Sequence, residues 1–210
     1  AGYLPMDGVD VLSATVSEKA GWRYVSVQVE QEIPDPVGDT SKPVIGVDLE
    51  IENLAILSDG TVYENPKAYC RHARKLIRLQ RSVSRKVKGS ANRKKVVRRL
   101  AKEHKKVADL RDNALHQITT ELAKTKSVIV VEDLNVDGMK RLFGRSVSDV
   151  GFHEFRRQLA YKTVWYGSRL VVADRFFPSS KLCSACGWKN ETLTLGERVW
   201  TCGGCGAVHD

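Results

Sequence analysis

The chain has 210 residues, a formal net charge of +9, 42% hydrophobic residues and five cysteines. This length allows one main domain with a small appended module, but not two full-sized domains. No apolar run approaches the ~20 residues that a membrane-spanning helix needs, and the start of the chain lacks the basic and apolar regions of a signal peptide. We therefore expect a cytoplasmic protein with no membrane partner.

The first part of the chain predicts a sheet-like segment followed by a linker. In GWRYVSVQVE (residues 21–30) three valines alternate with aromatic and polar residues, which is the period-two pattern of a strand. The next segment, QEIPDPVGDTSKP (31–43), holds three of the six prolines and predicts a loop. We place a domain boundary near residue 42.

Beyond that boundary the pattern predicts an α/β domain with a mixed sheet. Two or three antiparallel strands joined by tight turns are expected within residues 44–64. The segments SVIVVEDLN (127–135) and SRLVVAD (168–174) have the apolar profile of buried strands, the first of them buried on both faces. Between them, a Gly-containing polar stretch precedes FHEFRRQLAYKTVWYG (152–167), which predicts an amphipathic helix ending at Gly167.

A strongly basic helical pair is predicted at about residues 66–126, folding back on itself across Gly89 and Ser90. The window Lys67–Lys106 holds seventeen Lys or Arg residues and one acid, Glu103, so it carries +16 and leaves −7 for the remainder. Such a segment repels itself unless a polyanion neutralises it, which favours nucleic acid as the partner over a solvated helical face. The candidate nucleic-acid-binding residues are Arg71, Arg74, Lys75, Arg78, Arg81, Arg85, Lys86, Lys88, Arg93, Lys94, Lys95, Arg98 and Arg99.

Four of the five cysteines form two pairs near the end of the chain. Cys183 and Cys186 are separated by two residues, as are Cys202 and Cys205, and fifteen residues lie between the pairs. This spacing is typical of a zinc ribbon, and four thiolates suit tetrahedral Zn²⁺. It favours a structural zinc site over an iron–sulfur cluster or a redox motif. The segment TLTLGERVWT (192–201) between the pairs alternates as a hairpin does.

Two acids end strand-like segments: Asp48 follows VIGV, and Glu132 follows SVIVV. Carboxylates at the ends of neighbouring strands can converge on a pair of Mg²⁺ ions roughly 4 Å apart, as phosphodiester cleavage requires. Acids in such positions are also common as turn residues or helix caps. The spacing alone leaves both interpretations open.

The other notable side chains have structural interpretations. The histidines on polar or mixed helical stretches are predicted to be ordinary surface or packing residues. The helical spacing of Phe155 and Trp165 favours core residues over a platform for stacking bases. These histidines are His72, His104, His116 and His153.

Five motifs in order resemble TnpB, the transposon-encoded OrfB-type RNA-guided nucleases, which are similar to type V CRISPR effectors. The motifs are IGVDLEIENLAILSDG, the basic segment from HARKLIRLQ to ITTELAK, IVVEDLNVDGM, FHEFRRQLAYKTVWYG and FFPSSKLCSACGW. The resemblance covers about residues 20–210 and implies an RNase H-like RuvC domain with a zinc ribbon. It further implies that Asp48 and Glu132 hold catalytic Mg²⁺ or Mn²⁺, and that a guide RNA from the transposon end directs the cutting of DNA. The implied location is the nucleoid of a bacterial or archaeal cell.

On this resemblance residues 1–42 are expected to be the remnant of a wedge-like β-rich domain plus linker. Residues 43–176 would be the nuclease domain, and 177–210 a zinc ribbon truncated at its end. Two departures bear on activity. Glu50 stands where the family usually has glycine, and Asp210 matches the first aspartate of a closing motif whose second, two residues further on, binds metal. The sequence thus supports two hypotheses: a metal-dependent endonuclease incomplete at both ends, or a non-catalytic, decayed or repurposed nucleic-acid-binding protein.

Overall fold

The computed structural model describes residues 9–175, 177–194, 196–197 and 199–209, and for residues 137, 140, 142, 143, 145, 146, 148 and 179 it describes the backbone alone. By internal packing the chain divides into two compact units, Ala1–Val172 and Ala173–Asp210. Within the described residues, no helix has both the length and the apolar composition that crossing a membrane requires.

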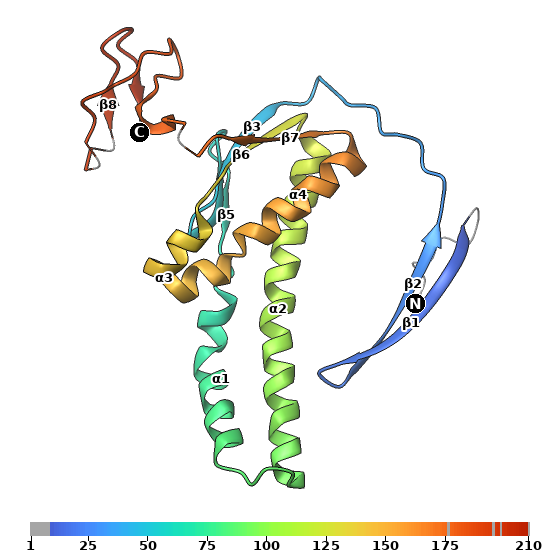
Figure 1. Ribbon diagram of the computed structural model, residues 1–210. Helices are drawn as coiled ribbons and strands as arrows, with labels where there is room; N and C mark the ends of the chain where they lie inside the picture. The colour runs from blue at the N-terminus through green and yellow to red at the C-terminus, as the bar shows by residue number, and fades with distance from the viewer. Residues whose placement is uncertain (1–8, 176, 195, 198, 210) are drawn as a thin grey trace. The chain divides into compact units, whose positions relative to one another are not determined.

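The larger unit is built on a five-stranded mixed sheet with the strand order β5-β4-β3-β6-β7 (Figure 1). Strand β4 pairs antiparallel with both β3 and β5, whereas β3 and β6 run parallel. The strands are β3 (Val44–Asp48), β4 (Asn53–Leu57), β5 (Val62–Glu64), β6 (Val128–Glu132) and β7 (Arg169–Ala173). This sheet confirms the predicted α/β class, including the antiparallel strands expected within residues 44–64.

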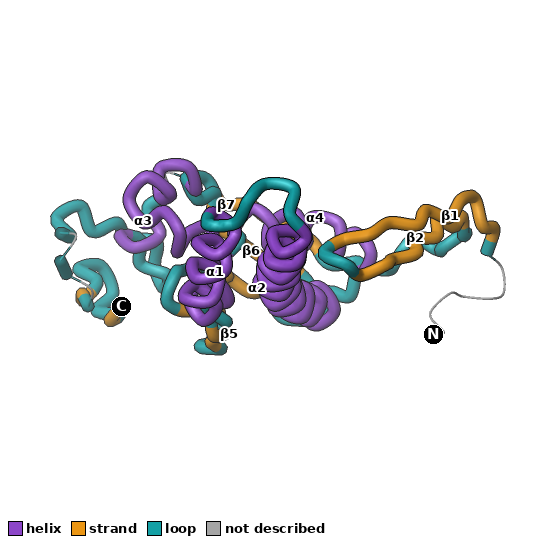
Figure 2. Tube along the Cα trace, turned by 90° about the horizontal axis from the view of Figure 1, so that it is seen from below, coloured by secondary structure: helices purple, strands orange, loops and turns teal. Residues whose placement is uncertain are grey.

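Two long helices are inserted between β5 and β6 and lie side by side (Figures 1 and 2). They are α1 (Ala68–Ser84) and α2 (Ala91–Thr125), which confirms the predicted basic helical pair. The side chain of Ser90 accepts a hydrogen bond from the N–H of Arg93 at 3.2 Å and so caps the start of α2. With 35 residues α2 is about 52 Å long, so only part of it can cover the sheet.

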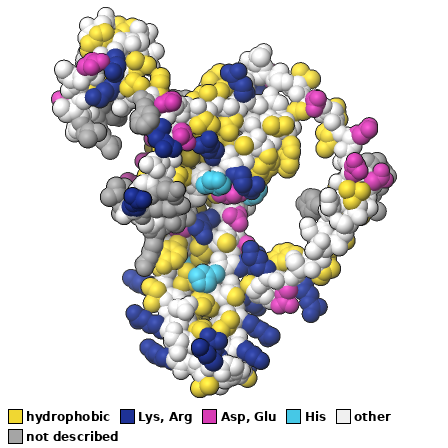
Figure 3. All heavy atoms as spheres, viewed as in Figure 1, with side chains coloured by type: hydrophobic (Ala, Val, Ile, Leu, Met, Phe, Trp, Pro, Cys, Tyr) yellow, Lys and Arg dark blue, Asp and Glu magenta, His cyan; other side chains and the backbone are white. Residues whose placement is uncertain are grey.

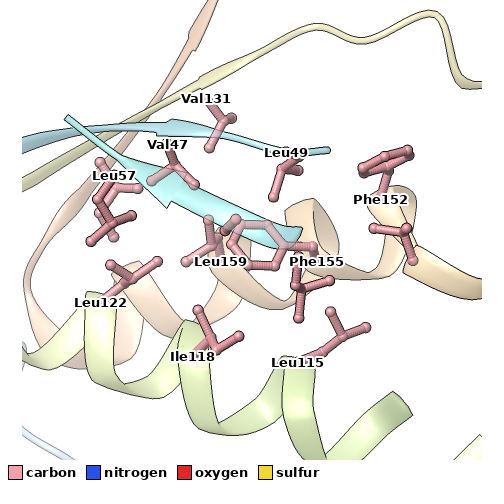
Figure 4. Packing of buried hydrophobic residues seen from close by; sticks show 14 of the residues in the cluster. Val47, Leu49, Leu57, Leu115, Ile118, Leu122, Val131, Phe152, Phe155 and Leu159 are labelled. Carbon is pink, nitrogen blue, oxygen red and sulfur yellow. The ribbon is translucent and has the colours of Figure 1, made fainter. Parts of the chain in front are cut away.

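The main hydrophobic core lies where the sheet meets α2 and α4 (Phe152–Tyr166) (Figure 4). Leu115, Ile118 and Leu122 of α2 recur at helical spacing and are all buried. From α4, Phe155 and Leu159 enter the same cluster at 1% and 0% exposure. The C-terminal half of α2 therefore anchors the helical pair to the sheet, and its basic N-terminal half continues beyond the sheet beside α1.

A buried polar network joins α2 to α4. The ammonium of Lys162, 4% exposed, donates hydrogen bonds to the hydroxyls of Thr119 (2.7 Å) and Thr120 (2.8 Å) and to the carbonyl of His116 (3.0 Å). Burial lowers the pKa of Lys162. Because a buried ammonium is costly unless it is hydrogen-bonded, this network specifies one register between the two helices.

The start of α1 is held by a side chain distant in the sequence. The carboxylate of Asp149, 5% exposed, accepts a hydrogen bond from the N–H of Tyr69 at 3.0 Å, and the guanidinium of Arg111 lies 3.7 Å away. Asp149 belongs to α3 (Val136–Val150). A carboxylate at a helix N-terminus stabilises the helix through its unpaired N–H groups, so the sheet domain fixes where the basic pair begins.

Several sequence-based expectations were wrong in detail. The Gly-containing polar stretch before α4, in which the sequence predicts no helix, forms helix α3, capped by Asn135, whose side chain accepts from the N–H of Gly138 at 3.1 Å. Its glycines obscured the helical pattern. Strand β6 buries Ile129 and Val131, while Val128 and Val130 are only half-buried, and β7 is an edge strand with no fully buried residue. Each of these two strands is therefore less buried than an apolar run suggests.

Residues ahead of the sheet form a long hairpin of β1 (Asp10–Lys19) and β2 (Trp22–Glu30), paired antiparallel. The alternating pattern correctly predicted β2, and β1 was not predicted. All ten residues of β1 are exposed, and Trp22 and Val25 of β2 are 60% and 67% exposed. No strand or helix is assigned between β2 and β3, as the proline content of that loop predicts.

Candidate nuclease centre, zinc site and basic surface

The two predicted acids lie next to each other at the ends of the two parallel strands. Val47 pairs with Val131 in the β3–β6 register, so Asp48 and Glu132, the following residues, occupy matching positions at the carboxyl edge of the sheet. Adjacent strands are about 4.8 Å apart. Partial burial raises the pKa of the Asp48 carboxyl, and the negative charge of Glu132 raises it further. The two carboxylates therefore act on each other electrostatically.

Glu50 adds a third negative charge beside Asp48. Its carboxylate also raises the pKa of Asp48, by less than Glu132 does. One oxygen of Glu50 accepts a hydrogen bond from the side-chain amide of Asn53 at 2.7 Å, which holds Glu50 over the β3–β4 turn. Oxygen ligands of this kind suit Mg²⁺ and Mn²⁺. A divalent cation would offset the repulsion between Asp48 and Glu132, so the chemistry of these two ligands suits such a metal.

The four cysteines of the two CxxC pairs converge in the smaller unit. Their sulfur atoms all lie within 4.8 Å of one another. The Sγ atoms of Cys183 and Cys205 are 3.5 Å apart, and those of Cys186 and Cys202 are 3.6 Å apart. Four thiolates bound to one Zn²⁺ at about 2.3 Å would be separated by about 3.8 Å. Among the described residues, this is the one group of three or more His, Cys, Asp or Glu side chains gathered closely enough to share a metal ion, and it indicates a structural zinc site.

The two cysteine turns have matching backbone geometry. The N–H of Gly187 donates to the carbonyl of Cys183, and the N–H of Gly206 donates to that of Cys202, both at 2.9 Å. Both glycines have φ of 76°, a left-handed conformation that residues with a side chain rarely adopt. The two glycines therefore permit the tight turn that follows each cysteine pair.

Backbone and aromatic groups support the cysteine cluster. Burial opposes ionisation of the Cys183 thiol, but the N–H groups of Cys186 and Ala185 and nearby side chains outweigh it and bring its pKa to about 6. One of these is the ring of His209, whose Nε2 lies 3.1 Å from the sulfur of Cys183. The rings of Trp200 and His209 are 4.7 Å apart between centroids. No spacing signal singled out His209, because its approach depends on the pairing of two distant strands.

That pairing corrects the hairpin expected within residues 192–201. Strand β8 (Trp200–Thr201) pairs antiparallel with β9 (Val208–His209), on the far side of the second cysteine pair. The first pair is closed by a bridge between Leu182 and Lys189. Asp210, the residue that matches the first aspartate of the family's closing motif, lies outside the described residues.

The candidate nucleic-acid-binding residues lie on α1, on α2 and in the turn between them, and in Figure 3 Lys and Arg side chains gather along this helical pair. A groove of about 510 Å³ runs along α1. Its cationic lining residues are Arg74, Arg78, Arg81, Arg85 and Lys86, joined by Ile77 and Ser82. Because α1 places side chains three and four residues apart on one face, these cations form a continuous strip.

One predicted cation forms an ion pair with an acid of the chain itself. Lys75 lies 2.5 Å from the carboxylate of Glu103, and Nδ1 of His72 lies 2.6 Å from the same side chain. Glu103 is 5% exposed, and although its burial raises its pKa, the hydrogen bonds from Lys75 and His72 outweigh this and lower it. The one acid of the basic window thus joins α1 to α2, and His72 is a packing residue as predicted.

Of the two aromatic residues of α4 that were predicted to lie in the core, one does and the other does not. Phe155 is buried in the core as predicted, but Trp165 is 65% exposed, which contradicts its placement there. Its ring stands edge-on to Tyr161 at 4.6 Å between centroids. Helical spacing alone could not identify which face of the last turn of α4 meets solvent.

Comparison with known proteins gives consistent results over most of the chain. The chain is 42% identical over 207 residues to a "Putative RNA-guided DNA endonuclease" of Streptomyces pristinaespiralis, covering 97% of this chain and 51% of that protein. It is 36% identical over 209 residues to the "Putative RNA-guided DNA endonuclease InsQ" of Escherichia coli K12, covering 91% of this chain and 52% of that protein. The chain thus spans about half the length of these relatives.

A solved structure supports the fold. The cryo-EM structure of a Cas12f1–sgRNA–target DNA complex matches with a TM-score of 0.50 at 15% identity, covering 93% of this chain and 52% of that one. The model of the Cas12f1-like TNB domain matches residues 152–210, which include the cysteine cluster. The model OrfB_IS605, described as "Probable transposase", matches residues 24–142, which are 119 of the 210 residues. The chain therefore belongs to the OrfB_IS605 family.

Proposed function

We propose that this chain is the nuclease portion of an RNA-guided, metal-dependent DNA endonuclease. The observation that carries the proposal is the matching position of Asp48 and Glu132 on adjacent parallel strands, where the charge of Glu132 helps to raise the pKa of Asp48. The names of the relatives supply the reaction and the substrate, DNA, and the partner would be a guide RNA from the transposon end.

In this proposal Asp48 and Glu132 hold Mg²⁺ or Mn²⁺ at the carboxyl edge of the sheet. When bound, the metal supplies Lewis acidity and neutralises the charge that develops at the scissile phosphate. The rigid parallel pairing of β3 and β6 keeps the two carboxylates in register, so that little reorganisation is needed on metal binding. Glu50, tied to Asn53, contributes negative charge from the side.

The other predicted residues have binding and structural roles. Cations of α1 and α2 contact the phosphate backbone, which positions nucleic acid without reading its bases. Zn²⁺ held by the four cysteines stabilises the smaller unit and takes no part in the chemistry, because four protein ligands leave no open position. The domain organisation that we propose is a wedge-like β-rich segment with linker over residues 1–42, a RuvC nuclease domain over 43–176 and a zinc ribbon over 177–210.

Conservative variants test the proposed centre. Asp48→Asn and Glu132→Gln should abolish guide-dependent DNA cleavage in Mg²⁺ or Mn²⁺ and remove Mn²⁺ binding measured by calorimetry on zinc-loaded protein. Both should leave nucleic-acid affinity unchanged. Glu52→Gln is the matched control, since Glu52 is an exposed acid of the β3–β4 turn, and it should behave as the unsubstituted chain does.

The results would also separate the second hypothesis, a non-catalytic nucleic-acid-binding protein. Undiminished cutting by Asp48→Asn or Glu132→Gln would refute the assignment of these two residues. An unsubstituted chain that binds nucleic acid with guide RNA present, but neither binds Mn²⁺ nor cuts, would favour the binding protein.

A further inference from the structure

A second basic groove lies between the β1–β2 turn and α2. It has a volume of about 380 Å³ and is lined by Glu18, Gly21, Arg23, Arg98, Arg99 and Lys102. None of these residues lines the groove along α1. The larger unit therefore presents two separate basic concavities, the second of which combines segments about 75 residues apart in the sequence.

Two observations place the hairpin turn next to α2. The ammonium of Lys105 lies 5.2 Å from the ring centroid of Tyr24, a cation–π distance. A Cβ on Gly21 would lie 3.5 Å from Cε of Lys102. Lys105 also binds Asp109 at 2.6 and 2.7 Å, so its charge is balanced within the protein.

The cations that line the groove are not balanced in this way. Arg23, Arg98, Arg99 and Lys102 are all exposed. Over the part of the chain that is described, none of the four has a carboxylate within ion-pair distance. Glu18 faces Arg23 across the hairpin register without forming an ion pair. Four like charges around one concave surface repel one another and favour a bound anion.

The spacing of the cations fits an extended anion. Lys94, Arg98, Lys102 and Lys106 follow one another at intervals of four residues on α2, and all four are exposed. Residues four apart lie on one helical face, about 6 Å apart along the axis, so this row extends over about 18 Å. Like charges at this spacing destabilise a helix unless something neutralises them. A compact anion would meet only one or two of them.

We infer that the groove between the β1–β2 turn and α2 is a second phosphodiester-backbone site, with Arg23 and Lys102 as binding residues. The inference rests on the proposed function, because it takes nucleic acid as the partner. Arg23, Arg98 and Arg99 can each form paired hydrogen bonds to a phosphate, and Lys102 extends the contact along the helix row. The α1 groove and this groove then hold two separate stretches of backbone.

Charge-neutralising variants of the full, zinc-loaded chain test the inference. We compare Arg23→Gln/Lys102→Gln with Arg78→Gln/Arg81→Gln in the α1 groove. The control is Lys124→Gln/Lys126→Gln at the C-terminal end of α2, which removes the same charge about 33 Å from Lys102; Lys126 pairs with Asp59 there. Far-UV circular dichroism verifies folding. Fluorescence anisotropy with labelled single-stranded RNA, single-stranded DNA and duplex DNA of equal length measures affinity across a salt series.

Each groove variant should weaken binding and reduce the salt slope by about 1.4 for a single strand or about 1.8 for duplex DNA, the effect of losing two phosphate contacts. The losses in log affinity should add when the two variants are combined, because the grooves are separate. The probe that loses most with Arg23→Gln/Lys102→Gln identifies whether this groove takes RNA or DNA.

The outcomes distinguish this inference from the proposed function. If Arg78→Gln/Arg81→Gln weakens binding while Arg23→Gln/Lys102→Gln matches the control, the second groove is refuted and the nuclease proposal stands. If Arg23→Gln/Lys102→Gln weakens binding but Asp48→Asn still cuts, the nuclease centre is misassigned and the groove stands. An unsubstituted chain that binds none of the three probes would overturn the inference.

Discussion

Replacing Glu103 with glutamine should loosen the basic helical pair. Glu103→Gln keeps the shape of a side chain that is 5% exposed but removes the negative charge that faces His72 and Lys75 at 2.6 and 2.5 Å. A hydrogen bond to a charged group contributes about 1.5–3 kcal/mol. The side chain of Lys75 is 52% exposed, so its ammonium can be hydrated by water in the variant. We therefore expect Glu103→Gln to lower the free energy of unfolding by about 1.5–3 kcal/mol. Breaking a fully buried ion pair would cost more, about 3–5 kcal/mol.

Urea unfolding followed by circular dichroism at 222 nm measures this loss, because the helices of the larger unit dominate the signal. Asp109→Asn is the control: it removes an exposed i,i+4 pair with Lys105 and should cost about 0–1 kcal/mol. The pKa of Glu103 is lowered below its ordinary value of 4.5. Its contribution is therefore fully present above pH 4.5 and is lost as the pH falls through the folded-state pKa.

The difference in unfolding free energy between the unsubstituted chain and Glu103→Gln should consequently be constant near neutral pH and shrink below about pH 4.5. A Glu103→Gln loss no larger than that of Asp109→Asn, or a difference that grows on acidification, would refute the reasoning that this carboxylate joins α1 to α2.

Two further predictions concern the core and the zinc site. Phe155→Ala should lower the free energy of unfolding by about 3–5 kcal/mol, because it opens a cavity in a filled core. Trp165→Ala, at a position that is 65% exposed, should change it by no more than about 0.5 kcal/mol. Equal losses for the two variants in urea titrations would contradict this packing. Chelation of zinc should remove hydrogen-exchange protection from residues 173–210 first, because structural zinc supplies folding free energy. Metal analysis should find one zinc ion per chain. The zinc should be lost in Cys202→Ser and kept in Cys70→Ser, since Cys70 is an exposed cysteine on α1. Folded protein that contains no zinc would refute the zinc site.

In the smaller unit, one sequence-based prediction was correct and another was wrong. The spacing of the two CxxC pairs predicted that their sulfurs converge, because two residues between cysteines form a tight turn whatever the surrounding chain does. The same reasoning failed for residues 192–201. Alternation there suggested a local hairpin, but Trp200 and Thr201 pair with Val208 and His209, and pairing across a cysteine turn leaves no periodic signal in the sequence.

In the larger unit, the sequence predicted the positions of the strands better than their burial. Apolar runs correctly predicted β3 and β6, since their residues favour extended backbone, but the runs overstated the burial of β6 and β7, which depends on what covers each face. Helix α3 was missed because Gly138 and Gly144 weaken its local propensity, and Val147 and Val150 become buried only through packing with distant residues.

The sequence by itself determined the basic helical pair, the four zinc-binding candidates and the two strand-end acids, because each follows from residue type at short spacing. Only the tertiary structure decided that Asp48 lies beside Glu132, since this adjacency depends on a parallel register between strands 84 residues apart. It also decided that Lys75 pairs with the buried Glu103, while Arg23 joins Lys102 in a second groove. Charge density is a property of the chain, but which charges remain available to a partner is fixed only when distant segments pack.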